Sequence, residues 1–318
     1  MSNTLRSCAS DLIYKIEQTS IYEWRAILRV DERDRFFFDH GLDHVPGMVL
    51  VEACLQTVEN ASVQRRFPAS DNLYFSSVRF DFARFCEHGL PTQIFVTSAP
   101  TDPSRWQVRA VQAGEVLASG EIVTSIIPPE VDTVTARASQ HERTARALVH
   151  KLQEENVLLG VLTRADDAWF EAAVLQPSYR DVWSGRCRDQ RSAGELIEAG
   201  RQFGTLVMHS VKGWPLDRQF VLQDFSIALT RPVFREEAVE LRVRPGPMRP
   251  HHIDSAGMLP WPGAAKGGRE TMSQVLRASG ALVGRIAFSA LLLPPAVYGR
   301  LRRGSKSAQV LSASQRSV

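Results

Sequence analysis

Apolar and polar residues alternate along several segments of the first half of the chain, with the two-residue period of a β-strand. The alternation is clearest over residues 22–30. Further strand-like segments cover residues 73–86, 93–99, 106–112 and 116–127. Turn residues such as Asp, Pro, Ser and Gly separate the last three segments. The pattern therefore predicts a run of antiparallel strands connected by tight turns.

Residues 47–64 follow a different period. Pro46-Gly47 is a turn signal, and the apolar run that follows has the spacing of a helix with one buried face. The residues that form this apolar stripe are Val49, Leu50, Ala53, Cys54, Val58 and Ala61. We therefore predict a long helix from Gly47 that packs against the antiparallel sheet, which is an α+β arrangement.

The same order of elements returns in the second half, residues 147–302. A second helix is predicted over residues 193–209. Strand-like segments cover residues 157–163, 168–175, 220–231, 239–243, 270–279 and 281–293. Between this half and the first domain, residues 1–127, the polar segment 128–146 is interpreted as a linker. The Ser-, Gln- and Arg-rich tail, residues 303–318, is predicted to be disordered.

The two predicted helices carry matching polar residues. Glu52 is followed four positions later by Gln56, and Glu198 is followed in the same way by Gln202. This spacing places the members of each pair on one helix face. The match indicates an internal duplication with a long period. We therefore expect one pseudo-symmetric double domain, with functional sites where the halves meet.

Composition and charge narrow the class of protein. The chain has 318 residues, of which 44% are hydrophobic and 23% charged, as is usual for a globular protein. Its net charge of +3 gives no bulk electrostatic argument for nucleic acid as a partner. The apolar stretch 281–297 is interrupted by Arg285 and Pro294, so we expect no membrane span. The four cysteines form no CxxC pair and no secretory signal is evident, so we expect free thiols and a cytoplasmic protein.

The densest group of chemically versatile side chains lies in residues 38–53. It includes His40, His44 and the corner at Pro46-Gly47. The corner aims the N–H groups of Gly47 and Met48, at a helix start, towards the space in front of them. Such groups suit a polarised carbonyl or a phosphate, although a plain tight turn is the alternative. The two histidines do not share a helix face and no third ligand is evident, so we predict no metal.

This segment resembles the hallmark segment of the A-factor synthase-type (AfsA-type) hotdog family, which makes γ-butyrolactone signals. The similarity runs from Phe38-Asp39-His40 to Glu52-Ala53, and residues 79–87 are similar to the strand that follows in the family. Residues 149–151, 155–159, 198–202, 215–220 and 298–302 are similar to parts of the family's other repeat. The hallmark repeat is normally second in the family and comes first here, so the order of the repeats is exchanged. The resemblance implies a tandem double hotdog, in which each half is a long central helix wrapped by an antiparallel sheet.

The resemblance also implies an activity. Members of the family pass a β-ketoacyl group from a thioester on acyl carrier protein to dihydroxyacetone phosphate, a phosphorylated three-carbon alcohol. We therefore expect a cofactor-independent acyltransferase of butyrolactone, butenolide or furan biosynthesis, which accepts a β-ketoacyl thioester of acyl carrier protein or coenzyme A. Because the duplication already supplies a pseudo-dimer, both a monomer and a homodimer fit.

Three residues are candidates for the chemistry itself. Glu198 matches a glutamate to which the family assigns importance, and its apolar neighbours would raise its pKa and suit it to act as a general base. Glu52 is its symmetric counterpart. Arg84 matches a functional arginine of the family and would hold the phosphate or an enolate, unless it forms a structural ion pair with Asp81 or Glu52.

The other candidate residues are expected to contact the substrates. They are His40, His44, Gly47, Met48, Arg201, Gln202 and Gln56. His44 is also interpreted as a brace for the turn. The two glutamines either orient ligands or bridge the two helices.

Two other functions stay open. A dehydratase, hydratase or thioesterase of the same fold would release an enoyl thioester or a free acid, with no need for a phosphorylated alcohol. A non-catalytic module that binds carrier proteins is favoured by Arg191-Ser192-Ala193, which stand where the family usually has a His-Asp-Pro run. The chain has no GxSxG motif, which disfavours a covalent serine mechanism.

Overall fold

The fold is described from a computed structural model. It describes residues 11–39, 41–65, 73–127, 141–166, 168–178, 183, 189–244 and 268–315, with side chains as far as Ser305. His40, most of the expected linker and residues 245–267 lie outside these ranges.

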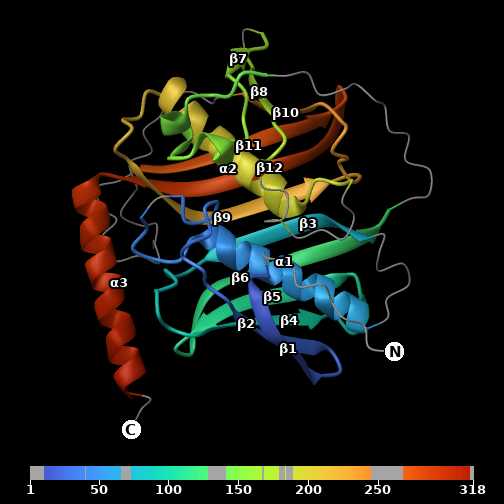
Figure 1. The fold of residues 1–318 in the computed structure, drawn as a ribbon, viewed down its shortest axis with the longest axis vertical. Coiled ribbons are helices and arrows are strands. Elements are labelled where there is room, and N and C mark those ends of the chain that lie inside the picture. The colour runs from blue at the N-terminus through green and yellow to red at the C-terminus, as the bar shows by residue number, and fades with distance from the viewer. Residues whose placement is uncertain are drawn as a thin grey trace.

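The described strands form one continuous sheet of twelve strands, in which every neighbouring pair is antiparallel (Figure 1). In sheet order, the strands of the first half are β1 (Ile13–Ser20), β2 (Glu23–Leu28), β4 (Thr92–Ser98), β5 (Arg105–Gln112), β6 (Glu115–Ile126) and β3 (Leu73–Phe82). Those of the second half are β9 (Gln219–Leu229), β12 (Ala281–Leu293), β11 (Gly268–Ala278), β10 (Val239–Val243), β8 (Phe170–Val174) and β7 (Thr163–Arg164).

The halves join where β3 pairs with β9, with Ser77 opposite Ala228 and Asp81 opposite Asp224. At this junction the rings of Phe80 and Phe225 stack with their centroids 5.6 Å apart. The sheet thus continues from one half to the other without an edge, which removes the unpaired strand that each half would otherwise expose.

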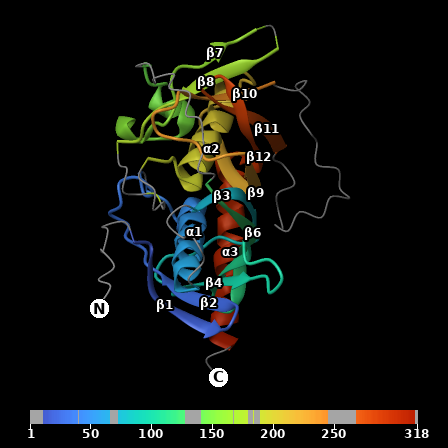
Figure 2. The same cartoon turned by 90° about the vertical axis from the view of Figure 1, so that its right-hand side faces the viewer.

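Two long helices lie against the same face of the sheet, one on each half (Figures 1 and 2). They are α1 (Gly47–Gln64) and α2 (Ala193–Ser210). Side chains on all sides of α1 are buried, because the sheet covers one side and other segments of the chain cover the rest. Each half is therefore a central helix wrapped by an antiparallel sheet, and the predicted tandem hotdog fold is confirmed.

The two halves repeat one small hydrogen-bond motif. The Oε1 atom of Gln56 accepts a bond of 2.9 Å from the backbone N–H of Leu12, and that of Gln202 accepts one of 2.9 Å from Leu158. Both glutamines thus tie the chain segment ahead of their helix to the helix itself. Neither lines the main cavity described below. Backbone groups occupy these side chains, and the expectation that Gln56 and Gln202 contact substrate stays a prediction.

Three segments differ from the sequence prediction. β1 was missed, because it is mostly exposed and lacks an apolar alternation. Residues 157–163 were predicted as a strand, but only Thr163 belongs to one. Leu159 and Gly160 form isolated bridges, and the segment follows the short 3-10 helix Glu154–Asn156. A further 3-10 helix covers Arg146–Val149.

The third difference is the tail. Helix α3 (Pro295–Gln315) runs past one side of the first half, so the backbone of residues 303–315 is helical, whereas the sequence predicted a disordered tail from residue 303 (Figure 1). The start of the helix is anchored by Val297 and Leu301, each 5% exposed, and by the buried Arg302. None of the helices in the described ranges is long and apolar enough to cross a membrane.

Candidate active site

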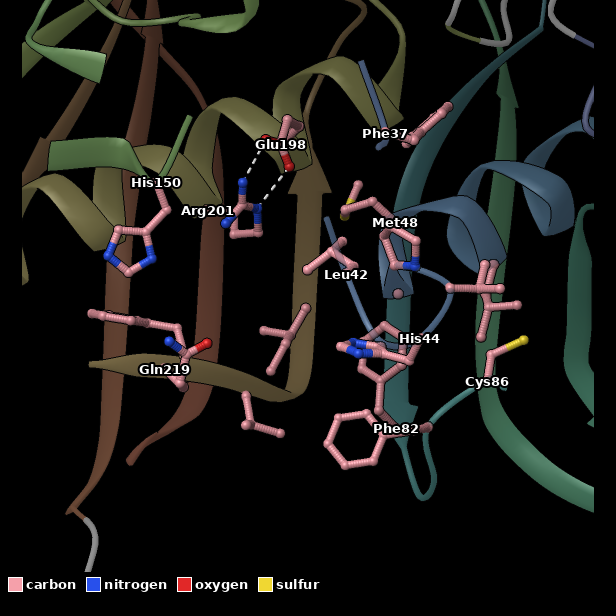
Figure 3. Close-up of a pocket in the computed structure, with 18 of the residues that line it drawn as sticks. Phe37, Leu42, His44, Met48, Phe82, Cys86, His150, Glu198, Arg201 and Gln219 are labelled. Atoms are coloured by element: carbon pink, nitrogen blue, oxygen red, sulfur yellow. Dashed lines mark hydrogen bonds and ion pairs between the residues drawn. The ribbon is translucent and has the colours of Figure 1, made fainter. Parts of the chain in front are cut away.

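A cavity of about 200 Å³ lies at the seam between the halves. The loop before α1 and the first turn of α1 form one side, and α2, β9 and the segment around His150 form the other (Figure 3). The residues that line it are Phe36, Phe37, Leu42, His44, Val45, Pro46, Gly47, Met48, Leu50, Phe82, Arg84, Phe85, Cys86, His150, Lys151, Glu198, Arg201, Gln219, Phe220, Val221, Leu222 and Tyr298. Both halves therefore contribute to one site, as the duplication predicted.

The carboxylate of Glu198 is the centre of a buried ionic cluster in this cavity. Arg201 donates two hydrogen bonds of 2.7 Å to it (Figure 3), and Gln202 donates a third of 3.0 Å. The Nζ atom of Lys151 lies 3.2 Å from the Oε1 atom of Glu198 and 4.7 Å from the ring centroid of Phe36. The side chains of Glu198 and Lys151 are 3% and 7% exposed. Glu198 thus holds two cations in fixed positions.

The protonation of this cluster differs from the prediction. Burial by itself would raise the pKa of Glu198, but the adjacent Arg201 and Lys151 bring it well below its usual range. Burial also lowers the pKa of Lys151, although Glu198 acts in the opposite direction. The expectation of a raised pKa for Glu198 was wrong, because the sequence did not reveal the two cations. A carboxylate stabilised in this way accepts a proton poorly at neutral pH.

The start of α1 forms the opposite wall. Pro46 occupies the N-cap position, and no described side chain caps the first turn or adds a negative charge to it. The backbone N–H groups of Gly47 and Met48 therefore lie at a helix start that borders the cavity, as expected. A Cβ atom at Gly47 would lie 3.0 Å from the ring of Phe82, so a side chain there would press on the wall of the cavity.

His44 lines the cavity two residues before Pro46, and its ring is held from behind. Its Nδ1 atom lies 2.9 Å from the Oδ1 atom of Asp43, and the ring packs edge-on against Phe85, with 4.8 Å between centroids. Two residues of α3 also bind Asp43: Tyr298 donates a bond of 2.9 Å to Oδ1, and the Nε atom of Arg302 donates one of 2.9 Å to Oδ2.

The other bonds of Arg302 reach the same region. It donates to the backbone oxygen of Asp43 and, through two bonds of 2.8 Å, to Glu87. The bond from His44 is the main cause of a pKa of Asp43 well below its usual range, and Arg302 and Tyr298 add to it against the opposing effect of burial. Asp43 is therefore ionised at neutral pH.

Arg84 lines the mouth of the same cavity, so the structure brings it together with Glu198. Its side chain is 42% exposed, and its Nη2 atom lies 3.6 Å from the Oε2 atom of Glu115. An exposed pair at this distance is weak. Of the two alternative partners, Asp81 lies 3.9 Å from Arg79, and Glu52 is fully buried in the core.

Glu52 occupies the pseudo-equivalent position at the start of the other helix. It is fully buried, and a Cβ atom on Gly194 in the first turn of α2 would lie 2.4 Å from its Oε2 atom and 2.8 Å from the ring of Trp183. Trp183 in turn packs against Phe36 and Phe37. Glu52 does not line the cavity, whereas Glu198 does, so the described parts of the two halves differ at these equivalent positions.

The residues Arg191-Ser192-Ala193, which differ from the family pattern, build the start of α2. Ser192 caps the helix by accepting a bond of 3.0 Å from the N–H of Glu195. Arg191 is buried and donates to Glu195 and to the backbone oxygen atoms of Leu175 and Val174. These residues do not line the cavity, so their difference from the family leaves the groups around Glu198 in place.

Three residues that line the cavity were missed as site residues, namely Lys151, His150 and Tyr298, and so were Asp43 and Arg302, which lie behind His44. All of them lie in segments on which the family resemblance rests or next to His44. His150 has a left-handed backbone (φ 54°), and its Nε2 atom lies 2.8 Å from that of His209. A non-glycine residue in this conformation at a cavity is a recognised sign of function, but the sequence carries no signal for it.

Cys86 also lines the cavity, but it is buried, and burial raises the pKa of its thiol to about 11. It is therefore a poor nucleophile near neutral pH. Within the described ranges, no group of three or more His, Cys, Asp or Glu side chains is placed to hold a metal ion.

A smaller cavity of about 60 Å³ lies between α2 and the strands β9, β11 and β12. Its lining is mostly apolar and includes Gly204, Met208, Met272 and Phe288. Arg201, Phe220 and Leu222 line both cavities. The small cavity, called the apolar extension below, is therefore a neighbour of the main cavity and of the ionic cluster.

One relative resembles part of the chain, and two solved structures resemble most of it. A 2-oxo-3-(phosphooxy)propyl 3-oxoalkanoate synthase from Streptomyces virginiae is 38% identical over 88 residues, which is 27% of this chain and 27% of that protein. The dehydratase domain of the CurF module of curacin polyketide synthase matches 90% of this chain and 99% of its own, with a TM-score of 0.53 and 10% identity. The dehydratase domain of PpsC from Mycobacterium tuberculosis, in complex with C12:1-CoA, matches 89% of this chain and 99% of its own. Its TM-score is 0.53 and its sequence identity is 11%.

At such low identity the two structures show that the fold is shared and no more. The family follows from a different comparison, in which the A-factor biosynthesis hotdog domain matches residues 13–128 and again residues 133–250. Together these matches cover most of the chain and include both α1 and α2. This protein therefore belongs to the A-factor biosynthesis hotdog family.

Proposed function

We propose that this protein transfers a β-ketoacyl group from a thioester of acyl carrier protein or coenzyme A to the hydroxyl group of dihydroxyacetone phosphate. The observation that carries the proposal is the seam cavity, where an uncapped helix start lies across from two cations fixed by a buried carboxylate. The name of the Streptomyces virginiae relative contains a phosphooxypropyl group and a 3-oxoalkanoate, which supports the same pair of substrates. The product would be an ester for butyrolactone, butenolide or furan biosynthesis in the cytoplasm.

The ionic cluster suits the phosphate of the acceptor. Lys151 and Arg201 carry two positive charges, which face the negative charge of Glu198 and, at longer range, that of the buried Asp39. A phosphate monoester carries about −1.5 to −2 charges at neutral pH. The guanidinium fork of Arg201 and the point charge of Lys151 are the usual partners of such a group. Arg84, at the mouth of the cavity, would bind the phosphate or the β-keto oxygen as they enter.

The start of α1 suits the thioester. The N–H groups of Gly47 and Met48 would polarise its carbonyl group, a role worth about 3–4 kcal/mol where single donors of this kind have been removed from enzymes. The acceptor's hydroxyl oxygen then attacks the carbonyl carbon. The new C–O bond forms, the C–S bond breaks, and the thiol leaves with the proton that the hydroxyl group lost. No cofactor takes part.

The apolar extension suits the aliphatic chain of the acyl group. It borders the cavity at Phe220 and Leu222, and it contains the flexible side chains of Met208 and Met272. Methionine adapts its shape to apolar ligands. An acyl chain that occupies the apolar extension would leave its thioester end in the main cavity, near the start of α1.

The Gly204→Leu variant should shift the preference of the enzyme towards shorter acyl chains. A Cβ atom at Gly204 would meet only Gln274 at 3.5 Å and Met272 at 3.8 Å, so a longer side chain would extend into the apolar extension. Each methylene that it displaces should lower kcat/KM about fourfold, from about 0.8 kcal/mol per buried methylene. Rates with a series of β-ketoacyl thioesters of increasing chain length measure this.

Gly204→Ala is the matched control. Its single methyl group fits at ordinary contact distances, so the chain-length preference should stay as in the wild type. An unchanged preference for acyl-chain length in Gly204→Leu would show that the acyl chain binds elsewhere.

Mass spectrometry of a simple reaction tests the proposed function. Purified protein is incubated with a β-ketoacyl thioester, with and without dihydroxyacetone phosphate. We expect the mass of the joined ester only when both substrates are present. Free acid in both reactions would indicate a thioesterase, and an enoyl product from a β-hydroxyacyl thioester would indicate a dehydratase. No turnover of any of these thioesters would favour a non-catalytic module that binds carrier proteins.

A further inference from the structure

The reaction proposed above needs a group that takes the proton of the acceptor's hydroxyl, and Glu198 is poorly suited to this. Its Oε1 atom already faces three donors, and its Oε2 atom receives the Nε–H of Arg201. Because the cations also favour its ionised form, protonation of Glu198 would break the cluster that holds Lys151 and Arg201. The proton acceptor must therefore be sought elsewhere on the wall of the cavity.

His44 has the geometry for this role. The carboxylate of Asp43 can only accept a hydrogen bond, so the Nδ1 atom of His44, 2.9 Å away, carries the hydrogen. In the neutral ring the Nε2 atom then holds a lone pair. No described residue makes a hydrogen bond to Nε2, and the ring is 18% exposed and borders the cavity (Figure 3). The ring lies three residues before Gly47, at the end of the cavity where the thioester carbonyl would be polarised.

Helix α3 of the second half keeps this arrangement in place. Tyr298 and Arg302 bind the two oxygen atoms of Asp43 through bonds of 2.9 Å, so the carboxylate cannot rotate away from His44. Arg302 also packs over the ring of Phe85, with 4.3 Å to its centroid, and His44 packs on the same ring. The helix start of the first half and the end of the second half thus form one unit.

We propose that the Nε2 atom of His44 accepts the proton of the hydroxyl group, and that Asp43, Tyr298 and Arg302 are positioning residues for it. This rests on the proposed acyl transfer. The hydroxyl oxygen bonds to the carbonyl carbon as its proton moves to Nε2. When the C–S bond breaks, the proton returns from Nε2 to the departing sulfur, so the ring ends as it began. Asp43 stays ionised throughout and stabilises the charged ring.

The charged and titratable groups around His44 come from its own loop, from α3 and from the walls of the cavity. Asp43 lies next to it, Tyr298 and Arg302 approach from α3, and Glu87 is linked through Arg302. Across the cavity are Arg84, His150, Lys151, Glu198 and Arg201. Because a neutral ring is required, the rate at limiting substrate should rise with pH.

The His44→Gln variant tests the proposal. General bases contribute about 10²–10⁴-fold to a rate, so kcat should fall by this factor, while KM for the thioester stays nearly constant and the rise with pH disappears. Asp43→Asn should lower kcat less, and it should also change the pH profile, which a merely structural residue would not do. His88→Gln is the matched control, because His88 lies in the same region but outside the cavity and binds Glu32 and the backbone of Leu42.

A second measurement is independent of turnover. Nitrogen NMR of histidine-labelled protein should show the Nδ1–H tautomer for His44, and Asp43→Asn should remove this preference. An Nε2–H tautomer in the wild type would overturn the proposal even if His44→Gln failed to fold. If the wild type makes the ester and a folded His44→Gln variant makes it equally fast, His44 is not the acceptor. If the wild type makes no ester, the proposed function itself fails.

Discussion

The Glu198→Gln variant is expected to lose about 3–5 kcal/mol of unfolding free energy, which is the usual cost of removing one partner from a buried ion pair. Its amide cannot neutralise Lys151 and Arg201, whose side chains are 7% and 25% exposed. The two cations would then repel each other, and the phosphate site would lose its shape. KM for dihydroxyacetone phosphate should therefore rise together with a loss of kcat. Denaturant unfolding and steady-state kinetics measure both effects.

The acid sensitivity of the protein should change in the same variant. The pKa of Glu198 is lower in the folded chain than its ordinary value of 4.5, so its contribution to stability is complete above that pH and is lost as the pH falls below it. As the pH falls below 5, the free energy of unfolding should therefore decrease less in Glu198→Gln than in the wild type. Glu154→Gln, at an exposed position, is the control. Unchanged stability and unchanged KM in Glu198→Gln would mean that the ionic cluster does not hold the acceptor.

Apolar spacing and nearby turn residues were sufficient to predict the two long helices, although burial extends around both of them. The predicted helix at residues 47–64 agrees with α1, and the second predicted helix, at residues 193–209, is one residue shorter than α2. Strand β1 was not predicted, because an exposed edge strand needs no apolar alternation. The start of α3 was not predicted either. It is held in part by Arg302, whose partners Asp43 and Glu87 lie more than two hundred residues earlier in the sequence.

For the candidate site, too, features set by neighbouring residues could be predicted, whereas contacts between distant segments could not. The loop before α1, with His44, Gly47 and Met48, was predicted from neighbouring residues, and the structure places all three on the cavity. The pKa of Glu198 depends on Lys151, which lies on a different segment and could not be paired with it from spacing alone. Likewise, the bond from Tyr298 to Asp43 joins the two halves of the chain, so the role of His44 became visible only when the fold was known.

The Arg302→Met variant is expected to lose about 3 kcal/mol of unfolding free energy, the lower end of the range for a broken buried pair, because Asp43 remains 41% exposed. Methionine keeps the apolar contact with Phe85 but leaves the carboxylates of Asp43 and Glu87 without their shared cation. Helix α3 would then be held chiefly by the side chains of Val297 and Leu301. Hydrogen exchange of α3 backbone amides, measured beside denaturant unfolding, should become faster in the variant.

Arg300→Met is the matched control, because it makes the same change in charge at an exposed position of the same helix. It should leave both stability and exchange close to those of the wild type. The pKa of Asp43 is held low in part by Arg302, so in Arg302→Met it should move up towards its ordinary value of 3.8. Asp43 would still be ionised at neutral pH, and the loss of kcat should therefore reflect a misplaced His44 rather than a protonated Asp43. If kcat is unchanged while α3 exchanges faster, α3 stabilises the fold without positioning the ring.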